Sequence, residues 1–291
     1  MKPRVDVAIV TYGGGADLPA CVAALRRQGG RVGRVIVIDN DSPDDTAVIA
    51  AAIDGVEVVR NPTNVGYASA MNQAFTLCDE AYLLALNADC VLDDGYLEAC
   101  AAKLDSAPDV AGAMGVLRFE DGRIDSTGIT LDAGYRARDR DRHAASPSAG
   151  DPFGVSGAAA LWRRAAIEPL GSASQRWWQW LFVYWDDVEL CWRLRDHGWT
   201  FACVPGATAT HRRGSDTADA DFVEAQSLRN RLATVARHSG WRGLLAPRSA
   251  LASATTICRL ALRHPGALRR AAPVTAVRVG LRQRRADGSA Q

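Results

Sequence analysis

The sequence has no apolar run of the roughly 20 residues that a membrane-spanning helix requires. Its N-terminal apolar stretch is only a few residues long and is broken by Asp6, so we expect neither a signal peptide nor a membrane span there. The sequence also lacks a strong net charge, because 34 Lys and Arg residues nearly balance 33 Asp and Glu residues. With 48% hydrophobic residues in a chain of 291, wholesale disorder is excluded and one large globular core is expected.

No two cysteines are spaced as a CxxC pair, and their total of seven is odd. Most of them lie within apolar patterns. This arrangement is typical of reduced, buried thiols and argues against a zinc site or a disulfide framework. We therefore expect a cytoplasmic protein.

The balanced total conceals an uneven distribution of charge. Residues 241–291 contain ten arginines and one acid, Asp287, which gives them a net charge of +9. The remaining 24 basic and 32 acidic residues give residues 1–240 a net charge of −8. We therefore expect two parts of different character, a folded domain at 1–240 and an Arg-rich helical tail at 241–291.

Short β-rich runs alternate with helical patterns through the first 117 residues. Alternation of this kind predicts right-handed βαβ units, and therefore an α/β domain with a mostly parallel central sheet flanked by helices. The predicted strands are 5–10, 34–39, 56–60, 81–86 and 110–117. The predicted helices are 17–28, 44–53, 67–78 and 93–104.

The alternation breaks at residues 118–152, which are rich in Asp, Arg, Gly and Ser and predict a mobile surface excursion. After them we expect a helix near 187–197, a strand at 200–204 and a helix over 219–238. The prolines of the tail, Pro247, Pro265 and Pro273, are expected to divide it into short helices.

In open α/β sheets ligands bind beyond the carboxyl ends of the strands, so polar residues at those ends are the first candidates for a site. The first strand ends at Thr11 and Tyr12, which three glycines at 13–15 follow. These glycines do not make a dinucleotide fingerprint, because Leu18 stands where its third glycine belongs. They also lack the basic companion of a phosphate-binding loop, which argues against a nucleotidyltransferase.

Polar residues also follow the second and third strands. Asp39 and Asn40 end the second strand, and their side chains could pair with a base edge or with ribose hydroxyls. A turn followed by helix capping is the alternative, and we expect that role for the acids after them. Asn64 and Gly66 precede a helix whose free N–H groups could bind phosphate or sugar hydroxyls. A plain loop is equally compatible with that short stretch.

Asn87 and Asp89 follow the fourth strand two residues apart, so both side chains can face the same cleft. A carboxylate there suits a hard cation, Mg²⁺ or Mn²⁺, that bridges diphosphate oxygens. Asn-x-Asp is otherwise a common turn sequence. His211 could complete such a site as a neutral imidazole, although a lone histidine is more often a surface or hydrogen-bonded residue.

A second acidic cluster begins a helix at Asp186 and Asp187. Asp187 shares a helical stripe with Leu190 and Leu194, and because that stripe must face the protein body we expect Asp187 to point toward the cleft. Asp186 and Glu189 are expected to be solvated or to brace the helix. The helix dipole favours the charged form of Asp187, and the neighbouring aromatic residues oppose it. A helix-capping acid is the alternative.

Together, these stretches resemble glycosyltransferase family 2, whose members have the GT-A fold. The matching segments occur in the family's order and spacing over about residues 5–240. They are VAIVTY (7–12), VIVIDNDSPDDT (35–46), RNPTNVGYASAMNQAF (60–75), LLALNADC (83–90), VSGAAALWRR (155–164), YWDDVELCWRLRDHGW (184–199) and VPGATATH (204–211). The resemblance is strongest to the branch that contains bacterial rhamnosyltransferases and related cell-wall or polysaccharide enzymes.

The resemblance implies inverting, metal-dependent transfer of a sugar such as rhamnose from a dTDP- or UDP-linked donor to a hydroxyl of a glycan or lipid-linked acceptor. It implies a nucleotide-binding half at 1–117 and an acceptor-binding half at 118–240. The donor contacts that it implies are Thr11, Tyr12, Asp39, Asn40, Asn64, Gly66, Asn72 and Asn87. The implied acceptor contacts are Gly157, Ala158 and Trp185, the implied ligands of Mg²⁺ or Mn²⁺ are Asp89 and His211, and the implied catalytic pair is Asp186 and Asp187, with Asp187 as the base. Asn87 departs from the family's DxD motif by replacing its first acid.

The Arg-rich tail is either a solvated, partly disordered extension or a peripheral contact with an anionic bilayer at the inner face of the cell membrane. The apolar anchors expected in the second case are Leu244, Leu245, Leu251, Ile257, Leu260 and Leu262. Nucleic acid binding is not expected, because the tail has no platform of interleaved basic and aromatic residues. For the whole chain, the alternative to an enzyme is a catalytically silent nucleotide-sugar binding module, which Asn87 favours and Asp187 opposes.

Overall fold

The computed structural model describes residues 4–172, 175–213 and 219–289. Its strands are β1 (Val5–Thr11), β2 (Val32–Asp39), β3 (Val56–Arg60), β4 (Tyr82–Leu86), β5 (Cys90–Leu92), β6 (Val110–Arg118), β7 (Ile124–Ser126), β8 (Ile129–Leu131), β9 (Ala137–Asp139), β10 (Ala159–Arg163) and β11 (Thr200–His211). Its α-helices are α1 (Leu18–Arg27), α2 (Thr46–Ala51), α3 (Tyr67–Leu77), α4 (Tyr96–Ser106), α5 (Arg164–Ile167), α6 (Asp186–Asp196), α7 (Ala220–Leu245), α8 (Pro247–Arg263), α9 (Pro265–Ala271) and α10 (Pro273–Ser289).

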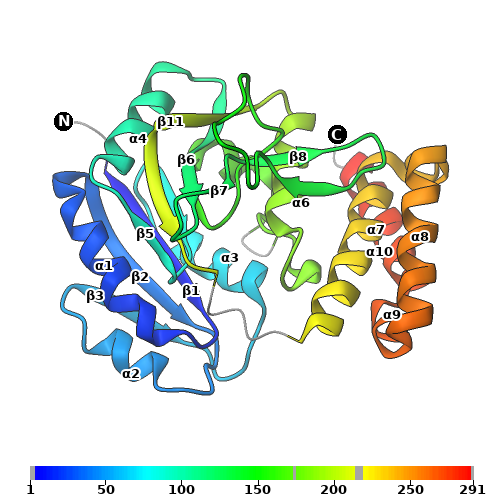
Figure 1. Cartoon of the computed structure of the whole chain (residues 1–291), viewed down its shortest axis with the longest axis horizontal. Helices are drawn as coiled ribbons and strands as arrows, with labels where there is room; N and C mark the ends of the chain where they lie inside the picture. Colours follow the sequence, from blue (N-terminus) through cyan, green and yellow to red (C-terminus); the bar gives the residue numbers. More distant parts are fainter. Residues whose placement is uncertain (1–3, 173–174, 214–218, 290–291) are drawn as a thin grey trace.

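The described residues form a nine-stranded central sheet with the order β3-β2-β1-β4-β10-β6-β11-β5, and β7 pairs with β6 outside that path (Figure 1). β1 pairs in parallel with both β2 and β4, and β2 pairs in parallel with β3. The predicted α/β class and mostly parallel sheet are therefore confirmed. β4 is a continuous apolar run, and β1 is apolar except at Asp6 and Thr11, because nearly all residues of both strands are buried.

The second half of the sheet departs from simple alternation. β10 runs antiparallel between β4 and β6, so the predicted strand at 110–117 does not neighbour β4 directly. β11 extends to His211, well beyond the predicted end at 204, and its last residues pair with β5. That pairing places His211 opposite Cys90, and Cys90 is the residue that follows Asp89 in the sequence.

Most of residues 118–152 lie at the surface, as the composition predicts, but the segment has regular structure and a buried part. They contain β7, β8 and β9, and residues 124–127 at β7 are buried. Polar side chains bind within the segment, as where the Thr127 hydroxyl donates to Asp141 at 2.6 Å. An apolar periodicity is absent because these buried residues are mostly polar.

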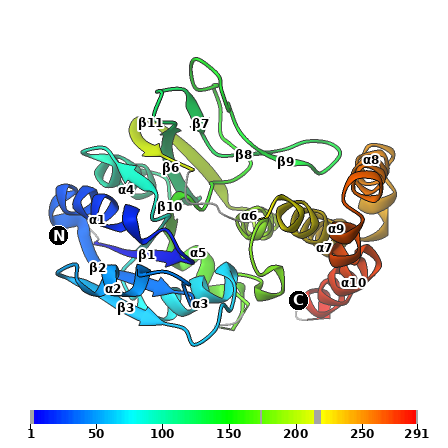
Figure 2. The same cartoon turned by 60° about the horizontal axis from the view of Figure 1, so that its bottom comes forward.

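Residues 241–289, which we call the C-terminal helical module, are not a solvated extension. α7 runs into this module through a kink at Gly240, where φ is 59°. Each of α8, α9 and α10 begins at a proline, as predicted, because proline is well tolerated in the first helical turn. α8 and α10 are longer than expected, at 17 residues each. Figures 1 and 2 show these helices grouped with α7 at one side of the molecule, away from β1, β2 and β3.

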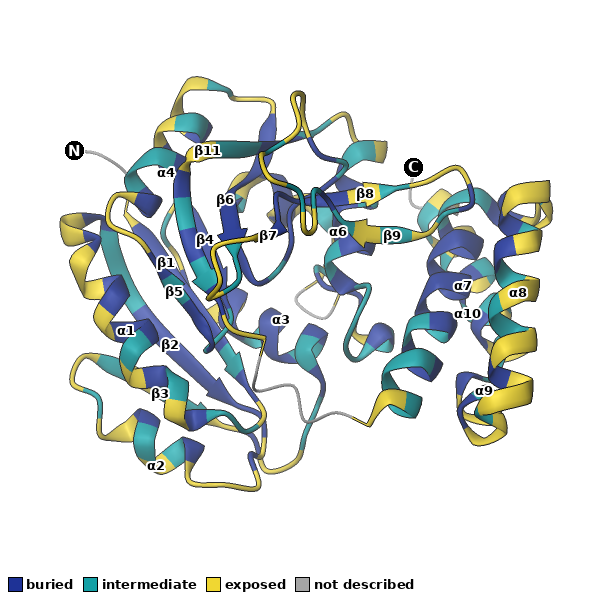
Figure 3. Cartoon of the chain, in the orientation of Figure 1, coloured by how far each residue is buried: buried dark blue, intermediate teal, exposed yellow. Residues whose placement is uncertain are grey.

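A second hydrophobic core joins α7 to the C-terminal helical module, and Figure 3 shows the buried inner faces of these helices. Among the predicted membrane anchors, Leu244 and Leu260 are buried in this core and Ile257 packs against it. These three residues were therefore wrongly assigned as anchors. The others, Leu245, Leu251 and Leu262, are exposed.

Two predictions about membranes and thiols can be compared with the described residues. No helix among them combines the length and the apolar character needed to cross a membrane. All seven cysteines lie in the described part of the chain, none is paired with another, and five are buried.

Candidate active site

A cavity of about 410 Å³ lies at the edge of the sheet where β4 and β11 end. Its walls come from the residues after β4, the turn before β10, the end of β11 and the start of α6. The predicted site residues that line it are Asn87, Gly157, Ala158, Trp185, Asp186, Asp187 and His211. Segments that are far apart in the sequence, and to which the resemblance assigns acceptor, base and metal roles, therefore share one cavity.

Asp187 lies in the first turn of α6 at the cavity wall. Its Oδ2 accepts a hydrogen bond from the Gly157 N–H at 3.2 Å, and its Oδ1 accepts one from the Val188 N–H at 2.8 Å. Burial raises the pKa of Asp187 above its usual value, although these two donors oppose the rise. A carboxylate with a raised pKa that faces a cavity is suited to accept a proton. The stripe below it, at Leu190 and Leu194, is fully buried, as predicted.

Asp186 and Glu189 are both buried, so the expectation of a solvated face was wrong. Burial, and then the neighbouring Asp187, raise the pKa of Asp186 well above its usual value. Glu189 does brace the helix, because it accepts bonds from Arg193 at 3.0 Å and from Arg237 at 2.6 Å. α7 covers this face of α6, which the periodicity of α6 alone could not indicate.

Asp89 and His211 form the other part of the site. Nε2 of His211 lies 3.4 Å from Oδ1 of Asp89 and 3.5 Å from Nδ2 of Asn87. Nδ1 of the same ring lies 2.8 Å from Oδ2 of Asp125, a fully buried carboxylate. Burial lowers the pKa of His211, but the hydrogen bonds to Asp125 and Asp89 outweigh it and leave the pKa above its usual value. His211 lines the cavity together with Asp187, and Asp89, which is not itself part of the lining, joins the site through its contact with His211.

The donor set around His211 can be tested for its fit to a divalent cation. Among the described residues, no three His, Cys, Asp or Glu side chains form a complete metal cluster. Asp89 and Nε2 of His211 supply two ligands at one point, and the carboxylate on Nδ1 is the usual support of a metal-binding histidine. This set fits Mg²⁺ or Mn²⁺, which take their remaining ligands from water and diphosphate oxygens.

The predicted donor contacts at the first two strands lie together but outside the lining of the cavity. Thr11 and Asp39 are paired in register at the ends of β1 and β2, and Tyr12 follows with 58% of its surface exposed. Oδ1 of Asp39 accepts a bond from the Ser42 N–H. Oδ2 of Asp39 accepts no hydrogen bond from a described residue and lies 3.4 Å from Nε of Arg60. Oδ2 is thus the acceptor of Asp39 that has no hydrogen bond from a described residue, in a side chain that is fully buried.

Three predicted donor contacts are already engaged within the protein. Asn40 donates to Oδ1 of Asn64 at 2.9 Å and accepts from Asn61 at 3.0 Å. Asn72 uses both ends of its amide on the backbone of Trp177, at 2.8 and 2.9 Å. These bonds hold the loops together and occupy part of each amide. The roles of Asn40, Asn64 and Asn72 as donor contacts stay a prediction.

The N–H groups before α3 do not face outward as expected. The Gly66 N–H donates to Oδ1 of Asn64 at 2.9 Å, and the Ala68 N–H donates to the Phe182 carbonyl at 3.1 Å. Gly66 has a left-handed φ of 83°, and a Cβ there would lie 2.4 Å from the Phe182 ring. The glycine is therefore needed for close approach of the Phe182 segment, and its role as a donor contact stays a prediction.

The three-glycine loop after β1 is also closed. The N–H groups of residues 13–15 donate in turn to the side chains of Ser42, Asp44 and Thr46, at 2.8, 3.2 and 2.9 Å. Every amide that a phosphate could use in this loop is thus occupied. The arrangement agrees with the sequence argument against a dinucleotide fingerprint.

Sequence reasoning missed three residues of the site. Asp125 supports His211, Arg213 lines the cavity and pairs with Asp125 at 2.8 Å, and Tyr67 lines the cavity close to Gly157. Tyr67 follows Gly66 and Arg213 follows His211 by two residues, so their proximity to predicted residues was a usable signal. Asp125 gave no signal, because it lies in a segment without periodicity.

Comparisons with known proteins agree with this geometry. The sequence model of glycosyl transferase family 2 matches residues 6–171, more than half of the chain. An N-acetylglucosaminyl-diphospho-decaprenol L-rhamnosyltransferase of Mycobacterium tuberculosis strain H37Rv is 26% identical over 294 residues, covering 86% of this chain and 93% of that protein.

Two solved structures share the fold. GalNAc-T7 with UDP, GalNAc and Mn²⁺ aligns with a TM-score of 0.63 at 15% identity, over 81% of this chain and 48% of that one. The mannosyltransferase PcManGT from Pyrobaculum calidifontis, in complex with GDP-Man and Mn²⁺, aligns with a TM-score of 0.58 at 17% identity, over 97% and 87%. The chain therefore has the GT-A fold and belongs to glycosyl transferase family 2.

Proposed function

We propose that this glycosyltransferase moves a sugar, with inversion, from a nucleoside diphosphate donor to a hydroxyl of a glycan or lipid-linked glycan. The observation that supports the proposal is that Asp187 and His211 line one cavity, with Asp89 in contact with His211. Asp187 is proposed to accept a proton. Asp89 and His211 are proposed to lie where the leaving diphosphate needs support.

Asp187 is proposed as the general base. Its carboxylate accepts the proton of the acceptor hydroxyl while the acceptor oxygen attacks the anomeric carbon. The bond from that carbon to the diphosphate oxygen breaks on the opposite face, and the nucleoside diphosphate leaves. General-base assistance of this kind contributes roughly 10²–10⁴ in rate. The N–H groups of Gly157 and Val188 hold the carboxylate in place for this step.

Asp89 and His211 are proposed to hold Mg²⁺ or Mn²⁺, which supplies positive charge to the diphosphate as it leaves. Asp125 fixes the ring of His211 so that Nε2 faces Asp89. Arg213, which lines the same cavity, offers a further cationic side chain at this end. Thr11, Tyr12 and Asp39 are proposed to hold the base and ribose at the ends of β1 and β2.

The proposed donor is a dTDP- or UDP-linked sugar such as rhamnose, and the proposed acceptor carries a lipid diphosphate. The support is the similarity to the mycobacterial N-acetylglucosaminyl-diphospho-decaprenol L-rhamnosyltransferase, which aligns over most of both chains. Gly157, Ala158 and Trp185 lie beside Asp187 at the cavity and are proposed to contact the acceptor.

A lipid-linked acceptor would be met at a membrane surface, and the C-terminal helical module is proposed to contact it at the cytoplasmic face. Leu251 and Leu262 are 66% and 85% exposed, and their spacing of 11 residues, about three turns, puts them on one face of α8. Leu245 is exposed as well, and ten arginines lie at 241–291. Apolar side chains beside basic ones are the composition that binds anionic bilayers.

The test of the function is nucleotide release by the full chain with Mn²⁺ and a panel of dTDP- and UDP-linked sugars, with and without a polyprenyl-diphospho-sugar acceptor. We expect release that depends on the acceptor for one donor. Donor binding with no release under any combination would support the alternative, a silent nucleotide-sugar binding module.

A further inference from the structure

The acid pair, Asp186 and Asp187, follows a turn with an unusual backbone. Three aromatic residues in it, Phe182, Tyr184 and Trp185, have left-handed φ values of 66°, 64° and 66°. This conformation is unfavourable for bulky side chains and persists only where the surroundings hold it. The residues at 181–185, which we call the aromatic turn, therefore need an external support.

The main support of the aromatic turn from α7 is the buried amide of Asn230. Its Nδ2 lies within hydrogen-bond distance of the carbonyls of Leu181 at 2.8 Å, Val183 at 2.8 Å and Tyr184 at 2.7 Å, which share its two N–H groups. Gln226, one helical turn earlier, donates to the Leu181 carbonyl at 2.7 Å. Asn230 is fully buried, so no water replaces these bonds if the amide is removed. α7 thus fixes the chain immediately before the acid pair.

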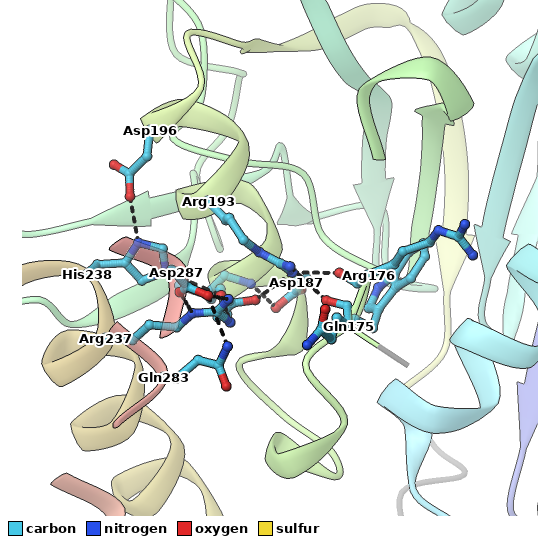
Figure 4. A network of polar contacts seen from close by, with 12 residues as sticks. Gln175, Arg176, Asp187, Arg193, Asp196, Arg237, His238, Gln283 and Asp287 are labelled. Atoms are coloured by element: carbon cyan, nitrogen blue, oxygen red, sulfur yellow. Dashed lines mark hydrogen bonds and ion pairs between the residues drawn. The ribbon is translucent and has the colours of Figure 1, made fainter. Parts of the chain in front are cut away.

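The same helix also fixes the chain immediately after the acid pair. Glu189 is fully buried and accepts from Arg237 of α7 at 2.6 Å, and Nε2 of His238 lies 3.3 Å from the same oxygen. Arg237 in turn pairs with Asp287 of α10 at 2.8 Å (Figure 4). Asp287, the one acid of residues 241–291, therefore locks the C-terminal helix onto the group that holds α6.

We infer that α7 positions the catalytic base, with Asn230 and Arg237 as positioning residues on the two sides of Asp187. This inference rests on the proposed function, because it assigns the residues a role only through Asp187. Its geometric basis is the 3.2 Å bond between Oδ2 of Asp187 and the Gly157 N–H, which fails if the start of α6 rotates or slides. The C-terminal helical module then supports the catalytic base through Asp287, in addition to its proposed contact with a membrane.

The test replaces Asn230 by its apolar isostere, Asn230→Leu, in the full chain. The three carbonyls lose their donor, the aromatic turn relaxes, and Asp187 moves away from the cavity wall. A displacement of about 1 Å costs on the order of 10²-fold in rate, so we expect kcat to fall by roughly 10- to 100-fold. Donor affinity, measured by calorimetry, stays within about twofold of wild type, since the donor contacts lie on β1 and β2.

The matched control is Gln28→Met, an amide-to-thioether replacement at another buried site. Gln28 ends α1, and its amide donates to the Asp93 carbonyl at 2.9 Å, remote from the residues that line the cavity. We expect this variant to lower the melting temperature while kcat stays within about twofold of wild type. A loss of kcat in Gln28→Met equal to that in Asn230→Leu would overturn the inference, because the effect would then follow stability.

A second variant, Asp287→Asn, tests the other side of the acid pair with a milder change. It weakens the hold on Arg237, and we expect kcat to fall by roughly three- to tenfold with donor affinity unchanged. If Asn230→Leu does not fold, Asp287→Asn tests the inference instead, again by a lowered kcat at unchanged donor affinity. A wild-type kcat in the folded variants would overturn the inference. The proposed function would still stand if the wild type shows acceptor-dependent transfer and Asp187→Asn loses it.

Discussion

Replacement of Asp125 by asparagine is a demanding test of the metal site, because no sequence motif pointed to this residue. Asp125 is fully buried on β7, with its Oδ2 2.8 Å from Nδ1 of His211 and 2.9 Å from Nε of Arg213. Burial would raise the pKa of Asp125, but the bonds from His211 and Arg213 outweigh it and hold the pKa below its usual value. The carboxylate is therefore charged when it supports His211.

Asp125→Asn keeps the shape of the side chain and removes its charge. Loss of a carboxylate behind a ligating histidine typically costs about 10- to 100-fold in metal affinity, or roughly 1.4–2.7 kcal/mol. Breaking a fully buried ion pair costs about 3–5 kcal/mol of stability. The cost here should be smaller, because 33% of the Arg213 side chain is exposed.

The assay is a Mn²⁺ titration in the presence of UDP, followed by electron paramagnetic resonance of the free ion, with thermal unfolding alongside. Asp121→Asn is the control, since Asp121 lies in the same segment and its ion pair with Arg123 is exposed and contributes little. We expect weaker Mn²⁺ binding only in Asp125→Asn. Equal Mn²⁺ affinity in the wild type and in Asp125→Asn would refute the assignment of His211 as a ligand that Asp125 orients.

Three further predictions follow from the site and the surface. Burial raises the pKa of Asp187 to about 6, and a base acts when deprotonated, so kcat measured against pH should fall as the pH drops below about 6; a flat profile down to pH 4.5 would contradict this. Gly66→Ala should lower the melting temperature far more than Gly55→Ala, because a Cβ at Gly66 meets the Phe182 ring at 2.4 Å whereas the one at Gly55 meets open space. Equal losses would show that only the backbone conformation matters. Leu251→Ser combined with Leu262→Ser should weaken flotation with anionic liposomes by at least tenfold, since each exposed leucine can contribute about 1.5–3 kcal/mol on burial, while Val48→Ser on α2 should change nothing. Unchanged flotation of the double variant would exclude α8 as the contact.

Much of the fold and of the site could be predicted because the signals are local. The strand pattern placed β1, β2 and β4, and the polar residues at their ends led to Asp39 and Asp89. The helical stripe of α6 was enough to predict that Asp187 heads a buried face. Each of these inferences uses a period or an end of one element.

The rest depends on contacts between elements that no local pattern encodes. Glu189 is buried only because α7 covers α6, and Leu260 is buried only because the C-terminal helices pack on α7. Asn40 was expected to bind a nucleotide, and its amide is hydrogen-bonded to Asn61 and Asn64 of the loop between β3 and α3. The place of Asp125 in the site depends on the pairing of β7 with β6, which no local pattern in the sequence indicates.

The central claim, that Asp187 is the base of a transfer reaction in this cavity, is tested most directly by Asp187→Asn. The amide oxygen can still accept the bonds from Gly157 and Val188, so the fold and donor binding should persist. The measurement is single-turnover sugar transfer with saturating donor and acceptor, paired with donor calorimetry. The account predicts donor affinity within about twofold of wild type and transfer slowed by roughly 10²–10⁴-fold. Transfer at the wild-type rate by the folded variant would contradict it.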